Sequence, residues 1–264
     1  MAQSAQAESP RIVSLNPALT DLALELGLGD FMVGVSDYCN QERIGAAKRL
    51  GSELTPDLEG ILAINASHVL RGTSLKRVEL RLKKTTKDIS LAMLTTEDLK
   101  AAIQALGAMF SRHKEATVLL TKLQEAMNRT TSFKERTLMV AGLSQHETPQ
   151  FFLMNPDSLH GDLVQAAGFP LIESPKNNRA WMVGPESLLR LRPSLMLVLD
   201  PSANQPDVQQ RYRRALKPFT STKTPLTVIW LSDPQLSSMG PNAFTLGEKT
   251  REAYRRDGDL KVQF

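Results

Sequence analysis

Two glutamates stand at equivalent positions in two copies of one sequence pattern. Glu59 lies in segment 55–71 and Glu186 lies in segment 182–198. Each copy predicts a short amphipathic helix with the Glu in its first turn, then a break and a buried strand. Aligning the glutamates also aligns four further residues: Leu62 with Leu189, Ile64 with Leu191, Ser67 with Ser194 and Leu70 with Leu197. A carboxylate there either stabilises the helix start or offers a charge to a partner.

The duplication predicts two similar lobes, each presenting one acidic residue on the same face. The copies are about half the chain apart, which is too long a period for a solenoid. Segments 16–27 and 155–168 form a second, looser pair. Each begins with Asn-Pro and ends with Gly, which are helix start and stop signals.

Between these segments, apolar strand patterns alternate with helical patterns, as in parallel sheets covered by helices. We therefore expect an α/β fold in which two similar βα lobes with parallel sheets are joined by one long rigid helix. The expected regions are a flexible N-terminal segment (1–10), an N-terminal lobe (11–94), a linking helix (95–130) and a C-terminal lobe (131–264). The expected strands are 11–15, 32–36, 67–71, 88–92, 137–142, 170–172, 195–199 and 226–231. The expected helices are 18–27, 57–64, 74–84, 96–129, 157–167, 185–191, 206–217 and 242–256.

The linking helix rests on apolar residues that recur with a helical period from Leu99 to Met127. Thr95 is the expected N-cap, with acids in the first turn. A helix of this length would be a rod of roughly 50 Å.

Catalytic and metal-binding motifs are absent from the sequence. It has no G-x-S-x-G, P-loop, H-E-x-x-H or G-x-G-x-x-G motif. Cys39 is the single cysteine, with no local His to activate it, and the four histidines are scattered: His68, His113, His146 and His160. We therefore expect no enzyme activity, no catalytic residue, no metal site and no cofactor of the protein's own. The net charge is only +4, and the sequence has no run of basic residues. It therefore gives no sign of nucleic-acid binding.

The N-terminus has one feature of an export signal. Residues 5–7 read Ala-Gln-Ala, the form of a signal-peptidase site, but no charged and apolar segments precede them. The start is therefore either the end of a signal peptide or a flexible tail.

Ligands of open α/β sheets bind at the carboxyl ends of the strands. The side chains expected there mix aromatic rings, amides and arginines, which suits a large small molecule that is partly apolar and partly anionic. The candidate ligand-binding residues are Asn16, Pro17, Tyr38, Arg71, Phe152, Asn155, Arg179 and Trp181.

Nearly the whole chain resembles the periplasmic binding proteins of ABC importers for vitamin B12, ferric siderophores and haem, of the helical-backbone (class III) type. The matching segments are 11–17, 26–39, 58–70, 95–99 and 185–195. The resemblance implies a monomer in the periplasm that captures a metal chelate in a cleft between the lobes. It also implies that Glu59 and Glu186 dock onto arginines of the permease dimer, which works with its ATPase.

The resemblance leaves the chelate open. Tyr38, Phe152 and Trp181 match cleft aromatics of the B12-binding proteins, but 51–53 reads Gly-Ser-Glu where those carry another Trp. The cations Arg71, Arg179 and Lys176 would suit the oxygens of a ferric siderophore. Haem would need an axial ligand such as Tyr38 or His160. Other readings are a ligandless interaction module of this fold and a chelatase-like enzyme or scaffold, which would need a metal-ligand cluster.

Overall fold

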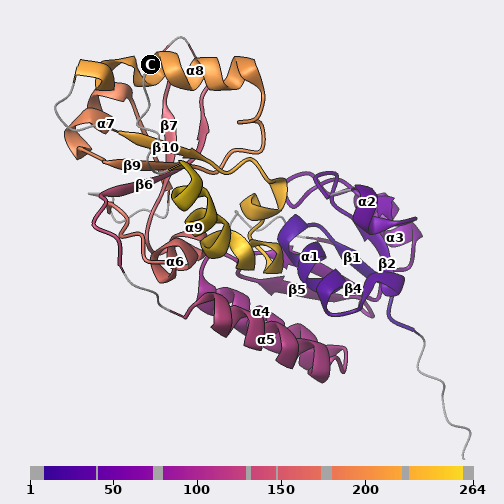
Figure 1. Cartoon of the computed structure of the whole chain (residues 1–264). Coiled ribbons are helices and arrows are strands. Elements are labelled where there is room, and N and C mark those ends of the chain that lie inside the picture. The colour runs from indigo at the N-terminus through magenta and orange to yellow at the C-terminus, as the bar shows by residue number, and fades with distance from the viewer. Residues whose placement is uncertain are drawn as a thin grey trace, which may run out of the picture. The chain divides into compact units, whose positions relative to one another are not determined.

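The computed structural model describes residues 9–39, 41–73, 80–128, 132–146, 148–173, 180–221 and 226–257. The chain divides into two compact units, Met1–Leu120 and Thr121–Phe264, called the N-terminal and C-terminal units below. Each unit contains one five-stranded sheet with flanking helices, coloured from indigo to magenta and from magenta to yellow in Figure 1. The predicted two-lobed α/β fold is confirmed.

The sheet of the N-terminal unit is wholly parallel, in the order β3-β2-β1-β4-β5. Its strands are β1 (Ile12–Ser14), β2 (Met32–Val35), β3 (Lys48–Arg49), β4 (His68–Gly72) and β5 (Lys87–Leu91). Its helices are α1 (Pro17–Glu25), α2 (Gln41–Ile44), α3 (Leu58–Ala63) and α4 (Thr96–Met109), with the 3-10 turn η1 (Gly29–Phe31). Val13, Val69 and Ile61 of α3 share one buried cluster, so α3 closes one face of the sheet.

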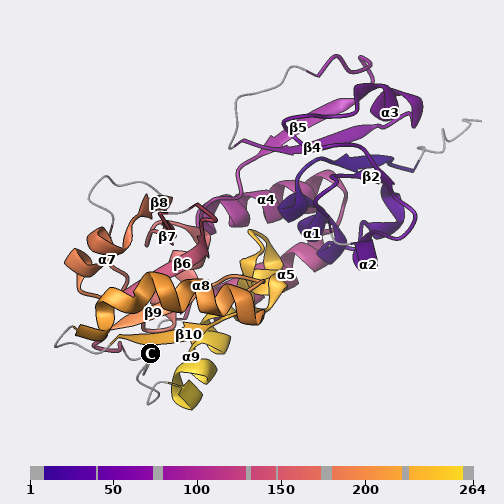
Figure 2. The ribbon, with the colours of Figure 1, turned by 90° about the horizontal axis from the view of Figure 1, so that it is seen from above.

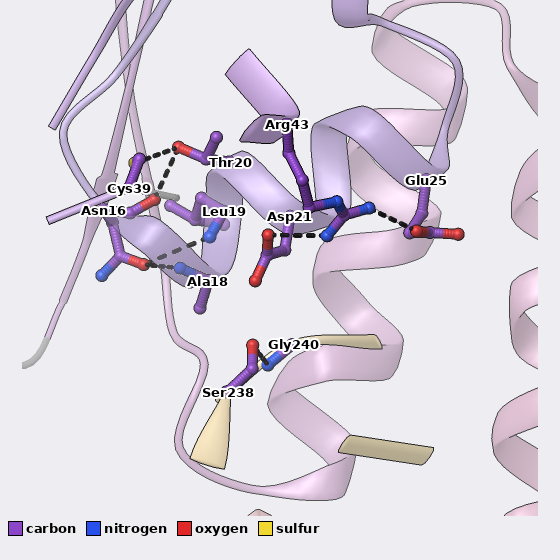
Figure 3. A network of polar contacts seen from close by, with 10 residues as sticks. All are labelled: Asn16, Ala18, Leu19, Thr20, Asp21, Glu25, Cys39, Arg43, Ser238 and Gly240. Atoms are coloured by element: carbon purple, nitrogen blue, oxygen red, sulfur yellow. Dashed lines mark hydrogen bonds and ion pairs between the residues drawn. The ribbon is translucent and has the colours of Figure 1, made fainter. Parts of the chain in front are cut away.

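A pair of ion contacts fixes α2 against α1 in the N-terminal unit. Arg43 reaches Asp21 at 2.9 Å and Glu25 at 2.7 Å, and both acids lie on α1, as Figure 3 shows. The loop expected at 37–55 thus contains α2 and β3. The helix expected at 74–84 is not formed over residues 80–84, and residues 74–79 lie outside the described chain.

The linking segment is not one helix. It consists of α4 and α5 (His113–Ala126), separated at Phe110–Arg112, where Ser111 has φ 55°. A Cβ on Gly107 of α4 would lie 2.6 Å from the Cβ of Ala116 on α5. The two helices therefore pack closely as a hairpin, and the expected rod of 96–129 was wrong.

The sheet of the C-terminal unit has the order β10-β9-β6-β7-β8. Its strands are β6 (Thr137–Leu143), β7 (Phe151–Met154), β8 (Ala180–Val183), β9 (Leu195–Val198) and β10 (Thr227–Trp230). If β6 is matched with β1, this order is that of the first sheet, with β7 alone reversed in direction. The labels in Figure 2 show β6, β7 and β8 side by side.

Helices α8 (Pro206–Leu216) and α7 (Pro185–Leu191) pack on the core that includes Phe151, Leu188 and Tyr212. Helices α6 (Leu159–Ala166) and α9 (Leu246–Asp257) pack together below the sheet in Figure 1. The short 3-10 segments are η2 (Lys217–Ser221), η3 (Pro234–Ser237) and η4 (Pro241–Thr245). The strand expected at 170–172 is only a single bridge from Leu171 to Thr137.

The sequence repeat is reproduced in hydrogen bonds. The Arg11 N–H donates to Ser67 Oγ at 2.8 Å, and the Arg136 N–H donates to Ser194 Oγ at 2.9 Å. The Arg11 guanidinium donates to the carbonyl of Ile64, the C-cap residue of α3. The Arg136 guanidinium donates to the carbonyl of Leu191 in α7. These are the Ser and apolar positions that the sequence alignment matched.

Candidate functional site

At the carboxyl edge of the N-terminal sheet, a tightly held turn presents Tyr38. The Arg49 guanidinium donates to the carbonyls of Ser36, Asp37 and Cys39, at 3.0, 2.6 and 2.9 Å. The side chain of Tyr38 is 78% exposed. Because Arg49 binds three carbonyls of this turn, the backbone at Tyr38 has little freedom. The ring of Tyr38 is therefore held at the surface.

Next to this turn, Asn16, Glu53 and Gly72 converge. The Gly72 N–H donates to the Glu53 carboxylate. A Cβ on Gly72 would lie 2.8 Å from Glu53 Oε1 and 2.9 Å from Asn16 Nδ2. The Asn16 Oδ1 accepts from the N–H groups of Ala18 and Leu19 and so caps α1 (Figure 3). Asn16 thus keeps its amide NH₂ for this edge, and Pro17 serves as the first residue of α1.

Arg71 is not available as a surface cation. It is 4% exposed and binds Asp88 through two contacts, Nε to Oδ1 at 2.8 Å and Nη2 to Oδ2 at 2.5 Å. The expectation that Arg71 binds ligand stays a prediction, and the geometry does not favour it, because ligand binding would break a largely buried bidentate pair. Glu53 and Arg49 are the residues of this edge that the sequence analysis missed; neither lies in a recognisable motif.

Cys39, behind Tyr38, is a structural residue. Its thiol donates to Thr20 Oγ1 at 3.2 Å (Figure 3), and burial raises the pKa of the Cys39 thiol. A thiol that resists ionisation is a poor nucleophile. The interpretation of Cys39 as inert agrees with this environment.

In the C-terminal unit, β7 and β8 turn one face to solvent. Phe152 lies opposite Met182 in the strand register, and the two side chains are 39% and 56% exposed. Trp181 lies opposite Leu153 and is partly buried against the core. Side chains alternate along a strand, so Phe152 and Met182 share the exposed face while Trp181 faces the core. Met182 was not among the candidate ligand-binding residues.

Two further candidates in the C-terminal unit are buried. Asn155 is 2% exposed, and its carbonyl accepts from Ser158 Oγ at 2.8 Å. His160 is 1% exposed; burial lowers its pKa to about 4, and the nearby backbone of Leu236 and Ser238 opposes this shift in part. Both side chains are buried, and the expectations that Asn155 contacts ligand and that His160 is an axial ligand stay predictions that this burial does not favour. Arg179 and Lys176 lie outside the described residues.

Glu59 and Glu186 occupy the same place in their helices. Each is the second helical residue, after Leu58 in α3 and after Pro185 in α7. Both side chains are exposed. The cap of α3 is Asp57, whose Oδ1 accepts from the Gly60 N–H at 2.9 Å, and α7 starts from Gly184. Neither glutamate is therefore the capping side chain of its helix.

The fold and the exposed residues together indicate a class of protein. Two α/β units with the same strand order, exposed aromatic residues at their edges and one matched surface carboxylate each are typical of bilobal solute-binding proteins. No helix in the described parts of the chain is long and apolar enough to cross a membrane. Residues 12–217 match the family model described as periplasmic binding protein. The chain belongs to this family, whose members are substrate-binding proteins of transport systems.

Individual relatives agree in fold. The vitamin B12-binding protein of Pectobacterium carotovorum subsp. carotovorum is 24% identical over 247 residues, which cover 90% of this chain and 86% of that protein. The periplasmic haem-binding protein HutB of Vibrio cholerae superposes with a TM-score of 0.75 at 17% identity, covering 92% of this chain and 98% of HutB. The vitamin B12-binding protein BtuF of Vibrio cholerae gives 0.70 at 17% identity, covering 94% and 98%.

Proposed function

We propose that this protein is an extracytoplasmic solute-binding protein that captures a metal chelate, cobalamin or a ferric siderophore, and delivers it to an ABC importer in the periplasm. The proposal is supported by family membership and by relatives that are named for vitamin B12 and haem. The observation that carries it is the pair of exposed glutamates at one position in two equivalent helices. Two matched charges suit a permease dimer with two matched basic sites, next to its ATPase.

The described residues of the N-terminal edge favour some chelates over others. Both arginines there are engaged, Arg49 with three carbonyls and Arg71 with Asp88. What remains at this edge is the Tyr38 hydroxyl, the Asn16 amide NH₂ and the carboxylates of Asp37 and Glu53, each of which also accepts a backbone N–H. Because carboxylates repel a polyanion, this edge suits amide, hydroxyl or hydroxamate groups better than a catecholate complex.

Haem is the second candidate ligand. With His160 buried, Tyr38 is the remaining axial ligand of the two considered, and its exposed hydroxyl is free of a burial penalty. Tyrosinate is a known protein ligand of haem iron. HutB, to which the chain is similar in fold, is named for haem binding.

A thermal-shift screen tests the proposal. The purified chain is heated with cyanocobalamin, haemin, a ferric hydroxamate and a ferric catecholate. A ligand that binds only the native state at about 100 times its Kd adds about 2.7 kcal/mol of stability and raises the unfolding temperature. We expect one class to do so. If none of the four raises it at millimolar concentration, the chain is the ligandless interaction module instead.

A further inference from the structure

A cavity lies within the C-terminal unit, where α8 covers the sheet, away from the exposed side chain of Phe152. It has a volume of about 450 Å³ and is formed where the loop after β6 meets the second half of α8 and the start of α7. This volume is within the usual range of small-molecule sites. Its apolar walls come from all three segments: Leu143, Pro149, Pro185, Ala215 and Pro218.

The polar part of this cavity is positively charged. Arg211 and Arg214 line it from α8, and His146 lines it from the loop after β6. The arginines are three residues apart, so their side chains lie on one face of the helix. Within the described chain, neither guanidinium forms an ion pair and no acidic side chain lines the cavity.

The charge belongs to a wider basic surface on α8. Residues 211–217 include Arg211, Arg213, Arg214 and Lys217 and no acid. Arg211 is half-buried and Arg214 is exposed, and neither has an ion-pair partner among the described residues. A guanidinium at a partly apolar recess gains more from an anion than one in open solvent, because the recess limits screening by water. The planar guanidinium groups of the two arginines also match the geometry of carboxylate or phosphate oxygens.

We propose that this cavity binds a small organic anion, a carboxylate or phosphate ester with an apolar body. The anionic group pairs with Arg211 and Arg214, and the apolar body lies against the proline and leucine walls. Pro185 of the cavity directly precedes Glu186. An occupant would therefore contact the helix start that carries the proposed docking residue.

Amide chemical-shift mapping of the full chain tests this proposal, with benzoate and phenyl phosphate as probes and neutral benzamide as control. We expect both anions to shift the signals of Leu143, Gln145 and Ala215, and benzamide to leave them in place. Shifts by benzamide of equal size, or shifts confined to other regions, would overturn it.

Substitutions on α8 provide the matched control. The double change Arg211→Gln plus Arg214→Gln should weaken benzoate binding by about tenfold or more, since both charge-assisted contacts are lost. Arg213→Gln removes one charge from the same helix, outside the cavity lining. It should change affinity by less than about twofold, and by less than either single change, Arg211→Gln or Arg214→Gln. An equal loss in the Arg213 variant would indicate a general charge effect. Binding of an acidic peptide without either small anion would make the cavity a protein-docking groove, and the proposal would be wrong.

Discussion

At the residue scale, amino-acid type was a poor guide to exposure. Arg71 lies near the end of β4 and Tyr38 lies just after β2, yet Arg71 is buried against Asp88 while Tyr38 is exposed to solvent. The partner of Arg71 lies on the adjacent strand β5, seventeen residues along the chain. A single sequence does not reveal an ion pair of this kind. Glu59 and Glu186 could be found because each stands at the same position of a repeated sequence segment.

The Arg71–Asp88 pair predicts a loss of stability without a loss of binding. Arg71→Met removes the bidentate contact to Asp88, and since Asp88 is only partly buried we expect the free energy of unfolding to fall by about 2–3 kcal/mol. Urea denaturation measures it. Lys100→Met, which removes an exposed 3.8 Å pair with Glu97, should cost less than about 0.5 kcal/mol. A stable Arg71 variant that no longer binds chelate would return Arg71 to the ligand site.

His160 predicts a specific pH dependence of stability. Its pKa is about 4 in the folded chain and about 6.5 when unfolded, so the unfolded state binds the proton first as pH falls. The free energy of unfolding should therefore drop by about 2 kcal/mol between pH 7.5 and 5 from this residue alone. In urea titrations, His160→Phe should remove this part of the pH slope, and the exposed His113→Gln should keep it. An unchanged slope in the His160 variant would contradict the burial argument.

At the element scale, the fold followed from the sequence where patterns were regular and failed where tertiary contacts decided. Alternating strands and helices predicted the parallel N-terminal sheet. Strands β7 and β8 were not among the expected strands. β7 runs antiparallel to β6 because a short loop, rather than a helix, connects the two strands. The break between α4 and α5 was missed because the apolar period continues across it and Ser111, not Gly or Pro, takes the positive φ.

The α4–α5 hairpin predicts an unusual response to a helix-favouring change. Gly107→Ala would ordinarily stabilise a helix by about 1 kcal/mol, but here the new Cβ meets Ala116 at 2.6 Å. We expect a net loss of about 1–2 kcal/mol from overpacking. Adding Ala116→Gly should give a double variant that loses less than the two single losses combined. Simple additivity in chemical denaturation would show that the helices do not press together at this point.

At the scale of the whole molecule, the two units carry the same hydrogen bonds and the same surface glutamate at equivalent positions. In both units, an arginine donates to a carbonyl at the end of the helix, and a serine accepts from the backbone N–H of that arginine. Both units also carry a glutamate near the start of this helix. A duplicated surface feature is explained by a partner that is itself duplicated.

The double change Glu59→Ala plus Glu186→Ala therefore should impair permease association and uptake while leaving fold and ligand affinity nearly unchanged. Each desolvated ion pair that is lost would cost roughly 2 kcal/mol or more of docking energy. Pull-down with the permease measures this. Glu97→Ala plus Glu125→Ala removes two other exposed glutamates and should have little effect. Normal uptake by the first variant, at equal protein level, would rule out the docking role.

The central claim is that this protein binds a metal chelate through exposed aromatic residues, with Tyr38 and Phe152 as the proposed contacts. Calorimetric titration tests it most directly, with cobalamin, haem and ferric siderophores added to the wild-type chain and to Tyr38→Ala plus Phe152→Ala. We predict saturable binding of one class to the wild type and a loss of about 2 kcal/mol or more of binding free energy in the variant, with unchanged unfolding temperature. Equal affinity of the two proteins, or no binding of any chelate, would contradict the account.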